Sequence, residues 1–246
     1  MSKTNGIILY EGPSQLDGAP IVVIAVGLKQ NSTNSKTGAM IQTYILRQDM
    51  PPLDAVREGA DESICGGCTH RGDGTGKGRS CYVTLMHGPR GVYQAYLNGR
   101  YPKATPAEIR SALADRMVRL GTYGDPAAAP ISLWRNAVAQ AKGWTGYTHQ
   151  WRVINWRWRE LVMASADSLD DMDEAHAKGY RTFRVTPVGT GPVKRREFNC
   201  PASEEAGKKI ECIDCLACMG TSAKHSASVQ IAAHGTGKGY VEAGAD

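Results

Sequence analysis

The sequence predicts an α/β fold: a partial (β/α) barrel or a curved parallel sheet, with an N-terminal β-hairpin and two cysteine-rich metal-binding loops. Two runs of β-branched residues near the N-terminus predict the hairpin. Apolar runs that alternate with capped helical segments predict parallel βα units, because parallel strands need a crossover between them. The cysteines all fall in two loops, which predicts the metal sites.

Composition excludes several classes of protein. A chain of 246 residues with 41% hydrophobic and 22% charged residues is neither disordered nor a membrane protein. The longest apolar run, residues 21–28, is too short to cross a bilayer. No apolar segment typical of a secretory signal follows Lys3, so we expect a cytoplasmic location. The net charge of +5 permits contact with nucleic acid without requiring it.

The N-terminal region, residues 1–60, contains the predicted hairpin. Its strands are expected at residues 20–28 and 39–46, separated by the polar stretch 29–38. Residues 61–91 have little periodicity and carry eight glycines between Gly66 and Gly91. A loop of this length is usually functional or is held by something other than a hydrophobic core.

Residues 92–199 are the predicted βα core, which begins with a short apolar run at residues 92–97. Strands are expected to begin at 117 and to occupy 145–149, 161–165 and 182–185. A capping box at Thr105 and Glu108 predicts a helix to about Asp115. Further helices are expected at 131–141 and between Ser168 and Gly179. Residues 200–224 form a cysteine-rich insertion, and residues 225–246 hold the last strand, at 229–234, and a tail.

Polar residues follow the predicted strands, at the edge of the sheet where ligands bind in this class of fold. They are Thr122, Tyr123, Gly124, Asp125, Tyr147, Thr148, His149, Ser165, Asp167, Arg184, Thr186 and His234. We expect Asp125, His149 and Arg184 to face one cavity as catalytic residues, and their substitution to impair function more than stability. The alternative is a rim of helix caps, a role that Asp167 and Ser168 can also fill.

The seven cysteines form two groups. The first is Cys65, Cys68 and Cys81, with His70 nearby, and the second is Cys200, Cys212, Cys215 and Cys218. Both groups lie in loops with Gly, Lys and Asp rather than among apolar neighbours. This setting favours metal ligation over inert buried thiols.

The spacing of the second group bears on the choice of metal. Structural zinc usually takes two Cys-x2-Cys pairs, and the triplet at 212, 215 and 218 does not divide into pairs. Such a triplet is typical of a [4Fe–4S] cluster, with Cys200, which precedes Pro201, as the fourth ligand. Zinc remains the alternative. The first group supplies three thiolates, so either His70 or His87 completes that site or its fourth position is open.

A three-cysteine cluster with an open iron resembles the site of the radical S-adenosylmethionine superfamily, which is built on a full or partial (β/α) barrel. Residues 121–126 (GTYGDP) are similar to the superfamily's Gly-rich acidic segment, which holds the methionine amino group. The resemblance implies two iron–sulfur clusters, one of them auxiliary, and S-adenosylmethionine as cofactor. It implies that the cofactor-binding residues are Gly121, Thr122, Tyr123, Gly124 and Ser165. The twelve residues between Cys68 and Cys81 depart from the superfamily's spacing.

The chain also resembles a family of bacteriophage and mobile-element proteins. The segments that carry this resemblance are residues 34–38 (NSKTG), 40–47 (MIQTYILR), 65–71 (CGGCTHR), 80–83 (SCYV), 146–152 (GYTHQWR) and 182–185 (TFRV). The resemblance implies a host-cytoplasmic location and brings no activity with it.

Two further motifs are weaker. Residues 151–159 (WRVINWRWR) either stack the bases of single-stranded nucleic acid or pack tryptophans on the sheet with arginines in solvent. The repeat GTGKG at 74–78 and 235–239 lacks the spacing of a P-loop and indicates flexible loops. We therefore expect an iron–sulfur enzyme acting on a small-molecule or nucleic-acid substrate, without a membrane. The alternative is a zinc-stapled, non-catalytic protein that binds nucleic acid or a host protein.

Overall fold

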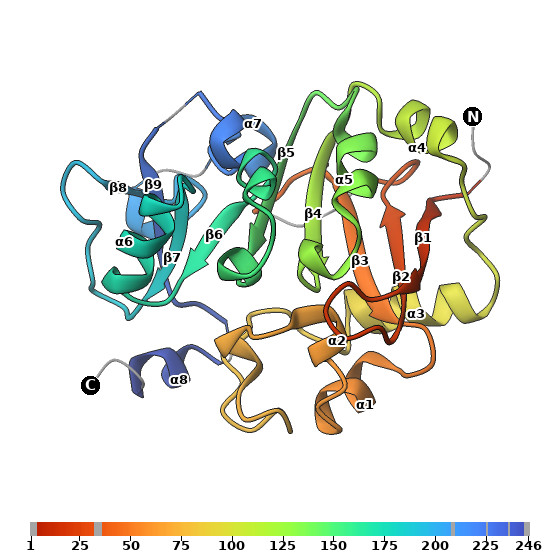
Figure 1. Ribbon diagram of the computed structural model, residues 1–246, viewed down its shortest axis with the longest axis horizontal. Helices are drawn as coiled ribbons and strands as arrows, with labels where there is room; N and C mark the ends of the chain where they lie inside the picture. Colours follow the sequence, from red (N-terminus) through yellow and green to blue (C-terminus); the bar gives the residue numbers. More distant parts are fainter. Residues whose placement is uncertain (1–3, 32–35, 208–209, 225, 236, 244–246) are drawn as a thin grey trace.

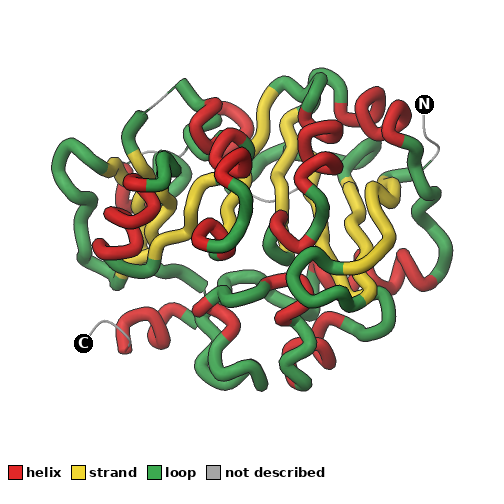
Figure 2. Tube along the Cα trace, viewed as in Figure 1, coloured by secondary structure: helices red, strands yellow, loops and turns green. Residues whose placement is uncertain are grey.

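The computed structural model describes residues 4–31, 36–207, 210–224, 226–235 and 237–243, which form an α/β fold around one sheet (Figures 1 and 2). Residues 34 and 35 of the NSKTG segment and Thr236 of the second GTGKG repeat lie outside these ranges. In these residues the sheet has nine strands, in the order β1-β2-β3-β4-β5-β6-β7-β9-β8. The strands are β1 (Gly6–Pro13), β2 (Pro20–Val26), β3 (Ile41–Arg47), β4 (Met117–Tyr123), β5 (Gly143–Thr148), β6 (Met163–Ala166), β7 (Thr182–Thr186), β8 (Glu197–Asn199) and β9 (Ser228–Ala232).

The sheet is mainly parallel, as the alternation of strands and helices predicts. β1, β2 and β3 pair antiparallel, and each pairing from β3 to the β9–β8 edge is parallel. The edge strands β1 and β8 do not pair with each other, so the sheet is open rather than closed into a barrel.

The predicted hairpin is present as β2 and β3, with Ile24 opposite Tyr44. The sequence pattern missed β1, which adds a further antiparallel strand whose Ile7, Ile8 and Leu9 are buried. It also missed β8, because three residues are too few to show a period of two.

The described helices are α1 (Pro52–Arg57), α2 (Glu62–Cys65), α3 (Gly88–Leu97), α4 (Pro106–Leu113), α5 (Ile131–Val138), α6 (Leu169–Ala177), α7 (Cys212–Cys215) and α8 (Lys238–Ala243). The capping box of α4 is confirmed: the Glu108 N–H donates to Thr105 Oγ1, and Glu108 Oε2 accepts the Thr105 N–H at 2.7 Å. The apolar run at 92–97 belongs to α3, which buries Val92 and Tyr93 on one face. The longest of these helices has ten residues, so none of them has the length required to span a bilayer.

The two sides of the sheet are covered differently. α4 packs on α5, and α6 packs on β6 and β7. α5 and α6 lie in front of the sheet in Figure 1. The segment containing α1 and α2 lies along the lower edge of the sheet in the same view, as does α8. The second cysteine group packs on the sheet itself, since Cys200 and Cys218 join a buried cluster with Met163, Val229 and Ile231.

Candidate metal and substrate site

The first cysteine loop is anchored across the carboxyl ends of three neighbouring parallel strands. After β4, the Asp125 N–H donates to the Ile64 carbonyl at 2.6 Å. After β5, Gln150 Nε2 donates to the Cys65 carbonyl at 3.1 Å. After β6, Asp167 Oδ2 accepts from Thr69 Oγ1 at 2.9 Å. These contacts place the loop where the fold predicts a ligand.

Two features hold this loop without a core of its own. Arg71 donates to Asp61 Oδ1 at 2.7 Å and to the carbonyls of Gly59 and Gly66, both at 2.9 Å. Gly66 has φ 54°, and a Cβ there would lie 2.5 Å from the Gln150 amide, so only glycine fits at position 66. The first glycine of CGGC is therefore a packing requirement, whereas a Cβ at Gly67 would meet only Gln150 Oε1, at 4.0 Å.

A cavity of about 460 Å³ extends along one face of the sheet. Five cysteines from the two groups line it: Cys65, Cys68, Cys81, Cys200 and Cys212. The predicted cofactor-binding residues also line it: Gly121, Thr122, Tyr123, Gly124 and Ser165. Of the expected catalytic residues, Asp125 and His149 contribute to its wall. The sequence thus predicted most of one side of this cavity.

Cys215 and Cys218, the other two cysteines of the second group, do not line the cavity. Cys218 is buried, and its carbonyl accepts the Gly146 N–H at 3.2 Å. Arg181, at the start of β7, donates to the carbonyls of Ala217 at 2.7 Å and Gly220 at 2.9 Å. These bonds hold the second cysteine group toward the amino ends of the strands, opposite the first group.

Arg184 does not share the cavity, so the expectation that it joins Asp125 and His149 there is wrong. Its neighbours Phe183 and Val185 line the cavity, and alternation along β7 places Arg184 on the other face. There its guanidinium forms two hydrogen bonds with Glu197, at 2.9 and 2.6 Å, and both side chains are buried. Arg184 forms a structural ion pair.

Asp125 joins the ends of β4 and β5. Its carboxylate accepts from the Ala127 N–H at 2.9 Å, from Thr148 Oγ1 at 3.0 Å and from the His149 N–H at 2.9 Å. Burial raises the pKa of Asp125 although these three bonds oppose the rise. The Asp125 side chain thus positions the backbone that carries His149.

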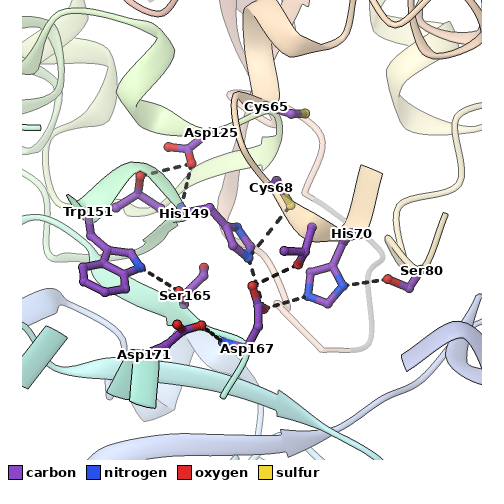
Figure 3. A network of polar contacts seen from close by, with 12 residues as sticks. Cys65, Cys68, His70, Ser80, Asp125, His149, Trp151, Ser165, Asp167 and Asp171 are labelled. Carbon is purple, nitrogen blue, oxygen red and sulfur yellow. Dashed lines mark hydrogen bonds and ion pairs between the residues drawn. The ribbon is translucent and has the colours of Figure 1, made fainter. Parts of the chain in front are cut away.

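His149 lies between the first cysteine group and Asp167 (Figure 3). Its Nε2 is 4.0 Å from Cys68 Sγ and 3.4 Å from Asp167 Oδ1. Burial lowers the pKa of His149, but Cys68 and Asp167 outweigh it and raise the pKa well above its ordinary value. Burial raises the pKa of Asp167, yet the His149 hydrogen bond and charge hold it at about 2. Asp167 is therefore ionised at neutral pH, beside His149 and Cys68.

His70, rather than His87, is the histidine of the first loop that reaches the cavity. His70 Nδ1 is 2.7 Å from Ser80 Oγ, and its Nε2 lies 3.7 Å from Asp167 Oδ1. Burial, followed by the neighbouring His149, lowers the pKa of His70. His87 is exposed at the start of α3 and is absent from the cavity wall.

The thiols within each group affect one another although their sulfur atoms are not tightly gathered. Burial, followed by Cys68, raises the pKa of Cys65. Burial raises the pKa of Cys200 to about 11 and that of Cys218 to about 12, with the other thiols of the group contributing. No three of the seven cysteine sulfurs lie within 4.8 Å of one another. A single zinc ion would bring them to roughly 3.8 Å, given Zn–S bonds of about 2.3 Å.

A buried cation lies on the wall between the two cysteine groups. Arg119 donates to the Tyr82 hydroxyl at 2.5 Å and lies 5.5 Å from the centre of the Tyr147 ring. Among the residues that the structure describes, no carboxylate forms an ion pair with it. Burial opposes its charge, but Tyr82, Tyr147 and Cys212 outweigh this effect and raise its pKa. A negatively charged group in the cavity would stabilise Arg119.

Sequence reasoning named Tyr147 among the polar residues at the strand ends but missed Arg119 and Tyr82. Arg119 lies within β4 rather than after it, and only the alternation of side chains along the strand indicates that it faces the cavity. The tryptophan motif at 151–159 mostly packs inward: Trp151 and Trp158 are buried, while Trp156 is exposed beside Arg157 and Arg159.

Comparisons of this chain with protein-family models, with curated proteins and with solved structures found no match. The functional argument therefore depends on the cavity, the residues that line it and their chemistry.

Proposed function

We propose that this protein is an iron–sulfur enzyme resembling radical S-adenosylmethionine proteins, with its reaction in the cavity between the two cysteine groups. The observation that carries the proposal is that five cysteines, drawn from both groups, line the same cavity of about 460 Å³ as residues 121–125. A metal that only staples a fold has a closed ligand shell, whereas a catalytic metal keeps an open position. Cysteines on the wall of a cavity favour the second arrangement.

The sequence spacing of the second group supports a cluster rather than a single zinc ion, because its triplet does not divide into Cys-x2-Cys pairs. Burial, together with the other thiols of each group, raises the pKa values of Cys65 and Cys218. A cluster binds each thiolate through a different iron atom. Cys65, Cys68 and Cys81 would hold the reactive cluster, and Cys200, Cys212, Cys215 and Cys218 the auxiliary one.

The remaining wall residues suit a polar cofactor and a small substrate. Gly121, Gly124 and Ser165 line the cavity near the first cysteine group, where S-adenosylmethionine would bind. A reduced cluster would supply an electron to that cofactor. Arg119 would stabilise negative charge on the cluster or on the substrate. The cavity volume fits a small molecule or a single flipped-out nucleotide.

Purification without oxygen tests the proposal. We expect brown protein that contains iron and acid-labile sulfide in several-fold molar excess. Cys68→Ala should lose part of both and Cys215→Ala another part, because each removes a ligand from a different group. Colourless protein that contains one or two zinc ions and no sulfide would contradict the proposal and would favour the zinc-stapled binding protein.

A further inference from the structure

Three side chains from separate segments converge beside the first cysteine group. His70 belongs to the 3-10 helix Thr69–Arg71, His149 follows β5, and Asp167 follows β6. Their potential ligand atoms all lie within 4.8 Å of one another, a grouping that no other His, Cys, Asp or Glu residues of the described chain form. The imidazole rings are 5.5 Å apart and nearly perpendicular, and both rings approach Asp167 (Figure 3).

The separations are long for hydrogen bonds and close to those between two ligands of one ion. Asp167 Oδ1 is 3.4 Å from His149 Nε2 and 3.7 Å from His70 Nε2. Good hydrogen bonds between such atoms are about 2.7 to 3.2 Å long. Two atoms bound at about 2.1 Å to one ion lie roughly 3.0 Å apart in octahedral geometry and roughly 3.4 Å apart in tetrahedral geometry. The separations of the two imidazole nitrogens from Asp167 Oδ1 come close to these values, and the three atoms all lie within 4.8 Å of one another.

Neighbouring side chains orient these groups as they do at metal sites. Ser80 Oγ lies 2.7 Å from His70 Nδ1, which leaves Nε2 directed at Asp167. Thr69 Oγ1 donates to Asp167 Oδ2 at 2.9 Å, which leaves Oδ1 for the histidines. Hydrogen bonds to the far side of a ligand fix its orientation, and their loss usually weakens metal binding about 10–100-fold.

We propose that His70, His149 and Asp167 bind one divalent transition-metal ion beside Cys68, whose Sγ lies 4.0 Å from His149 Nε2. Two imidazoles and one carboxylate are a ligand set that suits Fe(II) and similar ions and leaves coordination positions open. All three residues line the cavity, so the open positions face the substrate space. This site goes beyond the proposed iron–sulfur function and does not depend on it.

Manganese(II) is the probe, because it prefers nitrogen and oxygen ligands over thiolates. Full-length protein purified without oxygen is titrated with Mn(II), and the free ion is followed by electron paramagnetic resonance. We expect one bound equivalent for the wild type and at least about tenfold weaker binding for Asp167→Asn and His149→Gln. Ser80→Ala, which keeps all three ligands, should weaken binding by about 10–100-fold. His87→Gln is the matched control and should bind as the wild type does.

Wild-type protein that binds no Mn(II), or equal binding by wild type and Asp167→Asn, would overturn the proposal. Iron and sulfide are measured on the same samples, so that failure of the iron–sulfur proposal can be distinguished from failure of the His70, His149 and Asp167 metal site. Absent iron and sulfide with Mn(II) binding intact would contradict only the iron–sulfur function. Loss of iron and sulfide in His149→Gln, without Mn(II) binding by the wild type, would assign these residues to the cluster instead. Circular dichroism checks that each variant is folded.

Discussion

Replacing Asp125 by Ala tests how the strand ends are held together. The substitution leaves three donors without their acceptor: the N–H groups of Ala127 and His149 and the hydroxyl of Thr148. Each unsatisfied buried group costs about 1–3 kcal/mol, and removal of a buried charge offsets part of the sum. We therefore expect Asp125→Ala to lower the free energy of unfolding by about 3–5 kcal/mol. The sequence alone led to the opposite expectation, of a larger effect on function than on stability.

Urea-induced unfolding followed by circular dichroism measures this change. Thr148→Val removes one of the three donors and should cost about 1 kcal/mol. Asp173→Ala, whose side chain is 61% exposed and pairs with Arg196, is the matched control, and its effect should stay below about 1 kcal/mol. A change below about 1 kcal/mol for Asp125→Ala as well would refute the view that Asp125 ties β4 to β5.

The remaining predictions concern three other positions. Arg181→Met removes the hydrogen bonds to the carbonyls of Ala217 and Gly220. It should lower the free energy of unfolding by about 2–4 kcal/mol and release metal from the second cysteine group. An unchanged metal content would contradict this prediction. Burial opposes the charge of Glu197, but Arg184 outweighs it and lowers the pKa of Glu197. The ionised Glu197 side chain therefore stabilises the fold fully at pH values above the pKa that Glu197 has in the unfolded chain. This stabilisation is lost as the pH falls through the lower pKa that Glu197 has in the folded protein. Urea unfolding between about pH 5 and pH 3 should show a shallower stability loss for Glu197→Gln than for the wild type, and equal slopes would count against the ion pair. Gly124→Ala should destabilise the protein in the same assay, because Gly124 has φ 84° and an added Cβ would lie 2.7 Å from Ile45 Cβ. An unchanged midpoint of urea unfolding would contradict this steric argument.

Much of the cavity could be predicted because strand ends carry local signals. The apolar run before Gly121 and the polar residues after it identify the end of β4, and the same reasoning located His149 and Ser165. Parallel pairing then brings these residues to one edge without further information.

Other features depend on tertiary contacts that no local pattern encodes. The approach of His70 to Asp167 requires a long loop to fold across β6, and its anchors are single hydrogen bonds far apart in the sequence. The face of β7 that carries Arg184 follows from the period of two, but strand-end position alone cannot distinguish the two faces. Arg119 escaped notice because a buried arginine inside a strand resembles an ordinary structural residue.

Electron paramagnetic resonance of dithionite-reduced protein, with and without S-adenosylmethionine, tests the central claim most directly. A cluster held by Cys65, Cys68 and Cys81 with an iron open to the cavity should give a signal that changes when S-adenosylmethionine is added. The change should be absent in Cys68→Ala and preserved in Cys215→Ala. A reduced protein without any iron–sulfur signal, or a signal that S-adenosylmethionine leaves unaltered in the wild type, would contradict the assignment of the first cysteine group.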